Sequence, residues 1–213
     1  MSDSIKKHSK LGASIAHRWM ACPGSVRLSE NMPNVESEYA KECKQAHAFA
    51  EIMLNGEKIM FSVDEETAEA VVLYVNIVRV EGGWSPRNGK WSNAVWIEHR
   101  FDLSDLYPDC FGTADFVCYD GLDTLLVADY KHGKGVPVEV FNNKQMLYYA
   151  LGAYLTLGLK NVKWVKMVIV QPRAEHPAGP IREWKVSVAE LLDYALDLVE
   201  YAKATEAPDA PLV

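Results

Sequence analysis

Two β-forming runs that flank a short turn at Gly121 constrain the fold of this chain more than any other feature. Residues 111–119 and 124–131 are rich in the residue types that favour strands. Because so few residues separate them, the two runs are expected to pair as an antiparallel hairpin. With residues 121–123 as the loop, residue 120 pairs with residue 124, which sets the register of the whole hairpin.

This register places Asp115 directly opposite Asp129, with both side chains on one face. Lys131 lies two residues beyond Asp129 and shares that face, whereas Tyr130 points to the other side. Two carboxylates opposed across strands repel each other, and a divalent cation between them reverses that penalty. The alternative is an ordinary surface pair without a ligand. A slip of one residue would break the geometry, so the prediction depends on the turn.

The rest of the chain alternates between helical and strand patterns. We expect helices at about 14–20, 36–54, 64–81, 142–157 and 187–199, and further strands at 94–103, 163–171 and 181–186. Residues 84–93 are predicted to be a loop, and residues 207–213 a frayed end. The order of these segments predicts an α/β fold, in which helices flank a mixed central β-sheet.

Length and composition are those of an ordinary globular protein. The 213 residues fit a single domain over 1–213, with a helical N-terminal region at about 1–83 and a core at about 94–205. Hydrophobic residues make up 49% and charged residues 24%, which excludes disorder as the main state. There is no apolar run of the ~20 residues that a membrane helix needs, no secretory signal and no dense disulfide framework. We therefore expect a cytoplasmic protein without a membrane partner.

The charge of the chain bears on nucleic-acid binding. The net charge of −7 argues against indiscriminate binding to DNA or RNA. Charge is uneven, however, and the stretches 1–30 and 160–185 are both locally basic. These stretches either form a local surface for DNA or are ordinary solvated faces.

Two pairs of polar residues on the expected helices complete the set of candidate site residues. His47 and Glu51 are four residues apart and share a helix face, as do Gln145 and Tyr149 just after the hairpin. Each pair is a weak signal by itself, because most histidines on helices are packed or solvated rather than bound to a ligand.

In combination these residues resemble a known enzyme superfamily. Gly-Thr-Ala-Asp at 112–115, followed by Asp-Tyr-Lys at 129–131, is similar to the signature of the PD-(D/E)XK nucleases. His47-x-x-x-Glu51 upstream resembles the RecB-type and Cas4-type exonuclease branch, and Gln145-x-x-x-Tyr149 downstream does so too.

Three further stretches are similar to a phage and prophage group of RecB-like proteins, the DUF2800 type. They are Ser14–Ser25 (SIAHRWMACPGS), Lys131–Gly135 (KHGKG) and Tyr149–Ala153 (YALGA). The resemblance spans roughly residues 14–175. It implies a restriction-endonuclease-like core with the element order α-β-β-β-α-β.

The resemblance also implies metal-dependent hydrolysis of phosphodiester bonds in DNA. It assigns His47, Asp115 and Asp129 as ligands of a divalent cation, with the backbone carbonyl of Tyr130 completing the protein ligands. Lys131 would orient the attacking water or help to deprotonate it. Because Lys131 lies beside two carboxylates, it is expected to keep its charge, which favours stabilisation of the transition state as its role.

The same resemblance assigns the helical residues and the metal. Glu51 would hold a water on the metal or a second ion, and Gln145 and Tyr149 would position the DNA strand near the scissile phosphate. Ligation rich in oxygen suits Mg²⁺, and a single imidazole ligand makes Mn²⁺ a good substitute.

Cas4-like relatives often carry an iron–sulfur cluster, and the cysteines of this chain bear on that possibility. Cys22, just before Pro23, matches the first cysteine of such clusters, but no cysteine follows Cys118. We therefore expect no iron–sulfur cluster. The chain has no C-x-x-C pair either, which makes a zinc site improbable.

Three residues outside the motif core are candidates for contacting DNA. Arg18 and Trp19 have the chemistry to grip or stack on a strand, although Trp19 fits a core anchor for the first helix equally well. Lys134 is either a phosphate contact or simply the edge of a loop.

Together the motifs predict a phage-type DNA exonuclease that processes DNA ends for recombination. The implied partners are single- or double-stranded DNA ends and a phage single-strand annealing protein, in the host cytoplasm if the chain is phage-encoded. Two alternatives stay open: a catalytically weak DNA-binding or assembly module of the same fold, and an endonuclease. Strand polarity, strand preference and oligomeric state are left open by the sequence.

Overall fold

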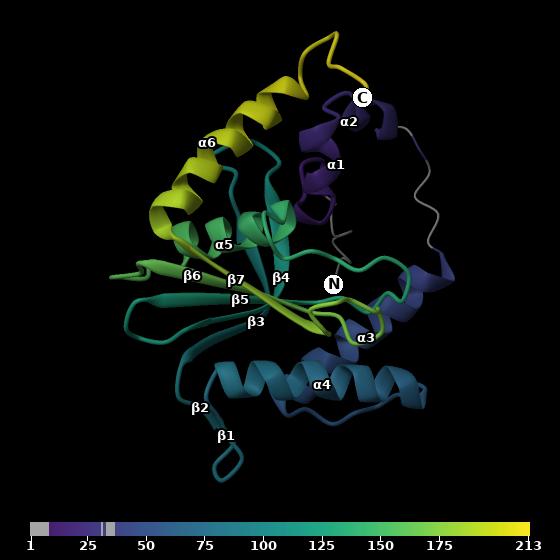
Figure 1. Cartoon of the computed structure of the whole chain (residues 1–213), viewed down its shortest axis with the longest axis vertical. Coiled ribbons are helices and arrows are strands. Elements are labelled where there is room, and N and C mark those ends of the chain that lie inside the picture. Colours follow the sequence, from purple (N-terminus) through teal and green to yellow (C-terminus); the bar gives the residue numbers. More distant parts are fainter. Residues whose placement is uncertain (1–8, 31, 33–36) are drawn as a thin grey trace, which may run out of the picture.

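The computed structural model describes residues 9–30, 32 and 37–213. A five-stranded sheet crosses the middle of the molecule, and helices lie on both of its faces (Figure 1). The α/β class and the mixed central sheet predicted from the sequence are therefore confirmed. Within the described ranges, no helix combines the length and apolar character needed to span a membrane.

The sheet has the strand order β3-β4-β5-β6-β7. Its β5–β6 pair is parallel and its other pairs are antiparallel. A parallel pair needs a long crossover, which here is the helix between β5 and β6. The strands are β3 (Ala94–Asp102), β4 (Phe111–Tyr119), β5 (Thr124–Tyr130), β6 (Trp164–Val170) and β7 (Ile181–Ser187).

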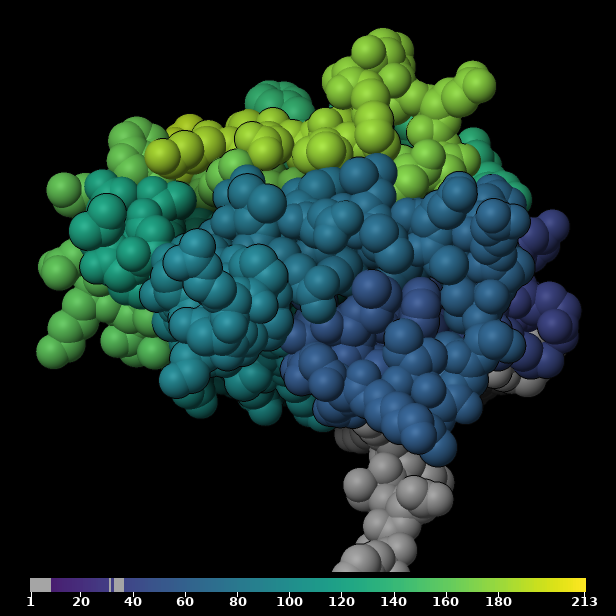
Figure 2. Space-filling view, turned by 90° about the horizontal axis from the view of Figure 1, so that it is seen from below, coloured from purple at the N-terminus to yellow at the C-terminus, as the bar shows by residue number. Residues whose placement is uncertain are grey.

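Two hydrophobic cores form, one on each face of the sheet. Helices α3 (Glu38–Asn55) and α4 (Glu65–Glu81) pack on one face. Helices α1 (Ala16–Ala21), α5 (Lys144–Thr156) and α6 (Val188–Ala204) pack on the other. Seen from below, α3, α4 and the segment after α4 cover the first face (Figure 2). The central strands are thus buried from both sides.

Local capping signals fix the ends of the long helices. The side chains of Ser37, Asp64, Asn143 and Ser187 each accept a backbone N–H of the first turn that follows. The helix predicted from residue 36 begins at Glu38, and residue 36 itself lies outside the described residues. Helix α3 ends at Gly56, whose φ of 69° suits a residue without a Cβ.

Short elements add to the predicted pattern. The one-turn helix η1 (Ala13–Ile15) and α1 together cover the helix predicted at about 14–20, and helix α2 (Ser25–Ser29) follows them. The predicted loop at 84–93 contains a small hairpin of β1 (Trp84–Ser85) and β2 (Lys90–Trp91). The rings of Trp84 and Trp91 pack against each other in a tilted arrangement, with centroids 5.0 Å apart, and support this hairpin. Patterns of hydrophobic periodicity do not reveal such a contact.

The predicted register of the central hairpin is confirmed. Tyr119 pairs with Leu125 and Phe116 with Ala128, as expected for a loop at 121–123. The Asp120 carboxylate organises the turn, because its Oδ1 accepts the backbone N–H groups of residues 122, 123 and 124 at 2.8–3.1 Å. Gly121, with φ of 77°, supplies the left-handed residue that the turn requires.

The C-terminal segment contradicts the prediction of a frayed end. Pro211 accepts a hydrogen bond from the Gly24 backbone N–H at 3.0 Å, and the Pro208 carbonyl accepts one from the Arg27 guanidinium. Ala210 is buried. A Cβ at Gly24 would lie 2.6 Å from the Ala210 carbonyl oxygen, so the glycine lets the two backbones meet. Polar, proline-rich composition does not reveal such a long-range contact.

The close packing of α5 on β3 yields a stability prediction. A Cβ added at Gly152 would lie 2.7 Å from Phe101 Cβ, which is fixed to the strand backbone. We expect Gly152→Ala to lower the free energy of unfolding by about 1–3 kcal/mol through overpacking, even though alanine favours a helix by about 1 kcal/mol. Urea unfolding followed by circular dichroism measures the change.

The matched control is Gly133→Ala, where a Cβ would meet nothing within 4 Å. Its free energy of unfolding should stay within about 0.5 kcal/mol of the wild-type value. A Gly152→Ala protein that is as stable as the wild type would contradict the tight packing of α5 against β3.

Candidate functional site

An irregularity in β3 and β4 opens the sheet at one point. Glu98 has a left-handed φ of 46°, and the ladder between β3 and β4 skips Glu98 and Asp115 while it continues on both sides of them. Ala114 packs in the core on the α5 side, whereas Phe116 packs in the core on the α3–α4 side. Since regular alternation would put both residues on one face, the strand changes faces at Asp115.

This change of face gives the Asp115 carboxylate two directions of contact. Its Oδ2 accepts the backbone N–H of Tyr130 at 2.7 Å, so a side chain takes over at the point where the β4–β5 ladder ends. Its Oδ1 faces His47 Nδ1 on α3 at 3.5 Å. The predicted placement of Asp115 and Asp129 on one simple face is therefore modified, because Asp115 also contacts the α3 side.

Asp129 lies on the α5 side of the sheet, as does Lys131. Asp129 Oδ2 is 2.9 Å from Lys131 Nζ. Gln145 on α5 bridges the pair, since its Oε1 accepts from Lys131 Nζ at 2.6 Å and its Nε2 donates to Asp129 Oδ1 at 3.2 Å. The same Nε2 donates to the Tyr149 hydroxyl at 3.1 Å. The structure thus joins four of the predicted site residues in one hydrogen-bonded group.

A second group forms around His47. His47 Nδ1 lies 3.6 Å from Glu98 Oε1 as well as 3.5 Å from Asp115 Oδ1. One ligand-type atom from each of His47, Glu98 and Asp115 lies within 4.8 Å of the others. A cluster of one imidazole and two carboxylates has the chemistry to bind a metal ion.

Burial and charge shift the pKa values of this centre. Burial opposes the charged imidazole, but the Asp115 carboxylate outweighs it and raises the pKa of His47. Burial raises the pKa of Glu98, and the charge of Asp115 adds to the effect against the opposing contact with His47. Burial likewise raises the pKa of Asp129, although Lys131 opposes the shift. Crowding of carboxylates in a poorly hydrated space causes these shifts.

Lys131 keeps its charge in this environment. Burial lowers the pKa of its ammonium group, but Asp129 outweighs that effect, so the net pKa is raised. A lysine with a raised pKa is a poor general base and a good electrostatic partner for an anion.

Tyr130 points to the face opposite Lys131, as the alternation predicts. Its buried ring stacks on Tyr74 of α4 with centroids 5.1 Å apart and lies 5.4 Å from the ring of His47. Its hydroxyl is 2.8 Å from His132 Nδ1. The ring of Tyr130 therefore packs against the imidazole ring of His47.

Three other predicted residues have exposed or partly exposed positions. Glu51, one turn after His47 on α3, is partly exposed, and its negative charge acts to raise the pKa of Glu98. Arg18 is exposed on α1. Lys134 is exposed and pairs with Glu66 of α4 at 2.6 Å.

Trp19 does not have the surface position that stacking on DNA requires. Its side chain is fully buried, and its indole Nε1 donates to the Gly12 carbonyl at 3.3 Å. The alternative prediction of a core anchor is therefore correct, because a large apolar ring stabilises the fold most when it is removed from water.

Glu98 is a member of the site that motif reasoning missed. Its signal in the sequence is weak, because Glu98 stands in a strand that also contains the polar residues His99, Arg100 and Asp102. Its position opposite Asp115 depends on the β3–β4 register, which the long connection between these strands leaves unpredicted.

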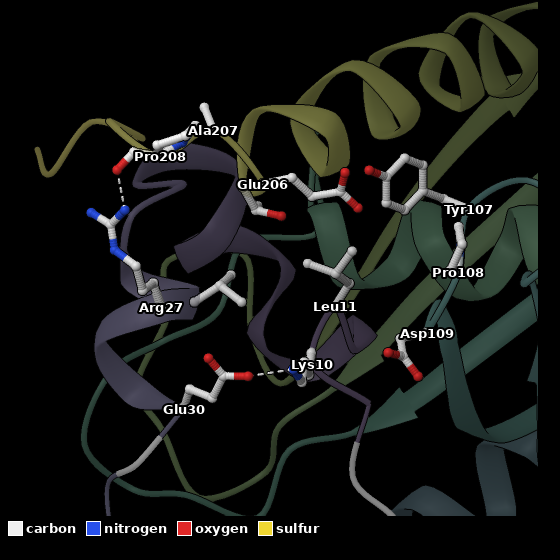
Figure 3. A pocket seen from close by; sticks show the side chains of 12 residues that line it. Lys10, Leu11, Arg27, Glu30, Tyr107, Pro108, Asp109, Glu206, Ala207 and Pro208 are labelled. Atoms are coloured by element: carbon white, nitrogen blue, oxygen red, sulfur yellow. Dashed lines mark hydrogen bonds and ion pairs between the residues drawn. The ribbon is translucent and has the colours of Figure 1, made fainter.

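A separate pocket of about 370 Å³ lies between α2, the C-terminal segment and the loop before β4 (Figure 3). Its charged walls are largely paired internally, through Lys10 with Glu30 and Arg27 with the Pro208 carbonyl. None of the predicted catalytic residues lines it. This pocket is therefore distinct from the acidic centre.

Comparisons with known proteins give two similar solved structures and a family match. The alkaline exonuclease LHK-Exo from Laribacter hongkongensis is similar over 89% of this chain and 94% of its own, with 14% identity and a TM-score of 0.33. The structure of LHK-Exo in complex with dAMP is similar over 90% and 92%, with 13% identity and a TM-score of 0.37. The family model for proteins of unknown function, DUF2800, matches residues 8–211. This match spans nearly the whole sequence, and the chain belongs to the DUF2800 family.

Proposed function

We propose that this chain is a divalent-metal-dependent deoxyribonuclease that hydrolyses phosphodiester bonds and acts on DNA ends. The observation that carries the proposal is the convergence of Asp115, Asp129 and Lys131 at the end of one hairpin, with His47 reaching Asp115 from α3. Two buried carboxylates and a partly buried ammonium are costly to bring together unless they serve a ligand.

The donor set fits a hard divalent cation. Asp129 Oδ2 is buried and, among the described residues, receives no well-aligned hydrogen bond, although Lys131 Nζ is 2.9 Å away. His47, Asp115, Asp129 and the backbone carbonyl of Tyr130 would hold Mg²⁺ or Mn²⁺. When bound, such a cation makes water more acidic and offsets the charge that develops on a phosphate.

The residues of the chain supply positioning and charge. Asp129 and Gln145 hold the Lys131 ammonium between them, so it is preorganised to stabilise the extra negative charge of the transition state. Gln145 and Tyr149 are held to each other and stand beside Asp129, where they would position the DNA strand. Glu51 would act at longer range, on a water or a second ion.

The wider functional setting belongs to the same proposal. The motif pattern of the sequence favours a restriction-endonuclease-like core of the RecB and Cas4 branch, formed by one domain over 1–213. We propose action on single- or double-stranded DNA ends in phage or prophage recombination, with Arg18 as an exposed contact for the strand. A phage single-strand annealing protein in the host cytoplasm is the proposed partner.

A digestion assay tests the function directly. We expect the protein to degrade end-labelled linear DNA with Mg²⁺ or Mn²⁺, to leave covalently closed circles intact and to be inactive in EDTA. Asp129→Asn and Lys131→Met should each lower the cleavage rate by at least about 100-fold, because each removes a charge from the transition-state environment. Labels at either end report the polarity.

Matched controls are Asp193→Asn and Lys203→Met, which change exposed residues of α6 and should keep the wild-type rate. Tight binding of DNA without cleavage would favour the binding-module alternative. Cleavage of closed circles would favour an endonuclease.

Metal binding is expected to stabilise the fold. A ligand that binds only the native state adds about 2.7 kcal/mol at 100 times its Kd, so Mn²⁺ should raise the Tm of the wild type. Asp115→Asn should remove most of that rise, because Asp115 contacts both His47 and the backbone of the strand that carries Asp129. Differential scanning fluorimetry with Mn²⁺ and with EDTA measures the shift, with Asp193→Asn as control. An equal shift in Asp115→Asn and the wild type would place the cation elsewhere.

A further inference from the structure

We propose that Glu98 is a direct ligand of the divalent cation, on the β3 side of the site, together with His47 and Asp115. The inference rests on the proposed function, which gives the cation its role. What it adds is a metal ligand from β3, outside the motif formed by Asp115, Asp129 and Lys131.

The geometry brings Glu98 to the centre rather than to solvent. Its carboxylate is 3.6 Å from His47 Nδ1, and the same nitrogen is 3.5 Å from the Asp115 carboxylate. The side chain of Glu98 is only 25% exposed although β3 is an edge strand of the sheet. An acidic side chain on an edge strand ordinarily extends into water, whereas this one lies against another carboxylate.

The backbone of β3 shows how the side chain reaches this place. Glu98 adopts a left-handed φ of 46°, and the ladder pairs on either side of it are kept while its own is missing. A regular strand would alternate Glu98 strictly with its neighbours. The local irregularity instead turns its carboxylate toward α3.

The charges of the centre match one divalent cation. In the ionised state that binds a metal, Glu98, Asp115 and Asp129 contribute three negative charges, and Lys131 contributes one positive charge. A histidine that binds a metal must be neutral, so two negative charges are left uncompensated in a mostly buried space. A single Mg²⁺ or Mn²⁺ cancels that excess.

Asp129 adds an independent observation, because its Oδ2 has an ion-pair contact with Lys131 Nζ at 2.9 Å but is otherwise unsatisfied among the described residues. Asp129 is 2% exposed, and its Oδ2 receives no well-aligned hydrogen bond among the described residues. The charges of Asp115 and His47 both act on it, so it borders the same space. The three atoms that already converge, however, belong to His47, Glu98 and Asp115. Glu98 is therefore as well placed for the cation as the motif carboxylate Asp129.

Titration with Mn²⁺ alone, followed by isothermal calorimetry, tests the role of Glu98. We expect Glu98→Gln, which keeps the shape and removes the charge, to weaken Mn²⁺ binding at least tenfold. Glu69→Gln, an exposed change on α4, should bind Mn²⁺ with wild-type affinity. Without metal, the Tm of Glu98→Gln should not fall, because the variant relieves repulsion with Asp115. A purely structural role would instead lower that metal-free Tm.

The outcomes separate this inference from the proposed function. Wild-type Mn²⁺ affinity in Glu98→Gln overturns the inference, even if DNA cleavage and its loss in Asp129→Asn are both observed. If Mn²⁺ binding depends on Glu98 but the protein cleaves no DNA, the result supports Glu98 as a metal ligand and overturns the proposed nuclease function. Absence of any Mn²⁺ binding by the wild type overturns both.

Discussion

The hydrogen bond from the Tyr130 backbone N–H to Asp115 Oδ2 is the contact on which the site depends. It lies where the backbone ladder of the β4–β5 hairpin ends, and it fixes the Asp115 carboxylate beside the strand that carries Asp129 and Lys131. Burial acts to raise the pKa of Asp115, but His47, with this hydrogen bond as a smaller contribution, outweighs burial and lowers that pKa. The ionisation of Asp115 thus depends in part on a hydrogen bond that only the observed register of the hairpin allows.

The sheet acts as a platform that joins contributions from its two faces. His47 comes from α3 on one face, and Gln145 and Tyr149 come from α5 on the other. Asp115 can meet both because β4 changes faces at that residue. Because each helix also packs in its own core, the polar groups are held by elements that are rigid for independent reasons.

A polar network that begins at Tyr130, next to His47, adds to this rigidity. The Tyr130 hydroxyl contacts His132, whose Nε2 is 3.0 Å from Glu42 on α3, and Glu42 in turn pairs with Arg173 at 2.6 Å. Buried polar groups that satisfy one another favour a single arrangement. The network connects α3 to the loops after β5 and β6, so it fixes the helix that carries His47 relative to the hairpin. His132, Glu42 and Arg173 therefore have a structural role beside the motif residues.

The sequence by itself determined the long helices, the α/β class, and the register of the central hairpin, because each depends on residues close together in the chain. It also indicated which of the two faces Tyr130 and Lys131 occupy. Tertiary structure alone decided that Glu98 joins His47, that Trp19 is buried, and that residues 207–213 pack against α2. These outcomes depend on contacts between distant segments, where packing and a break in strand alternation override local pattern.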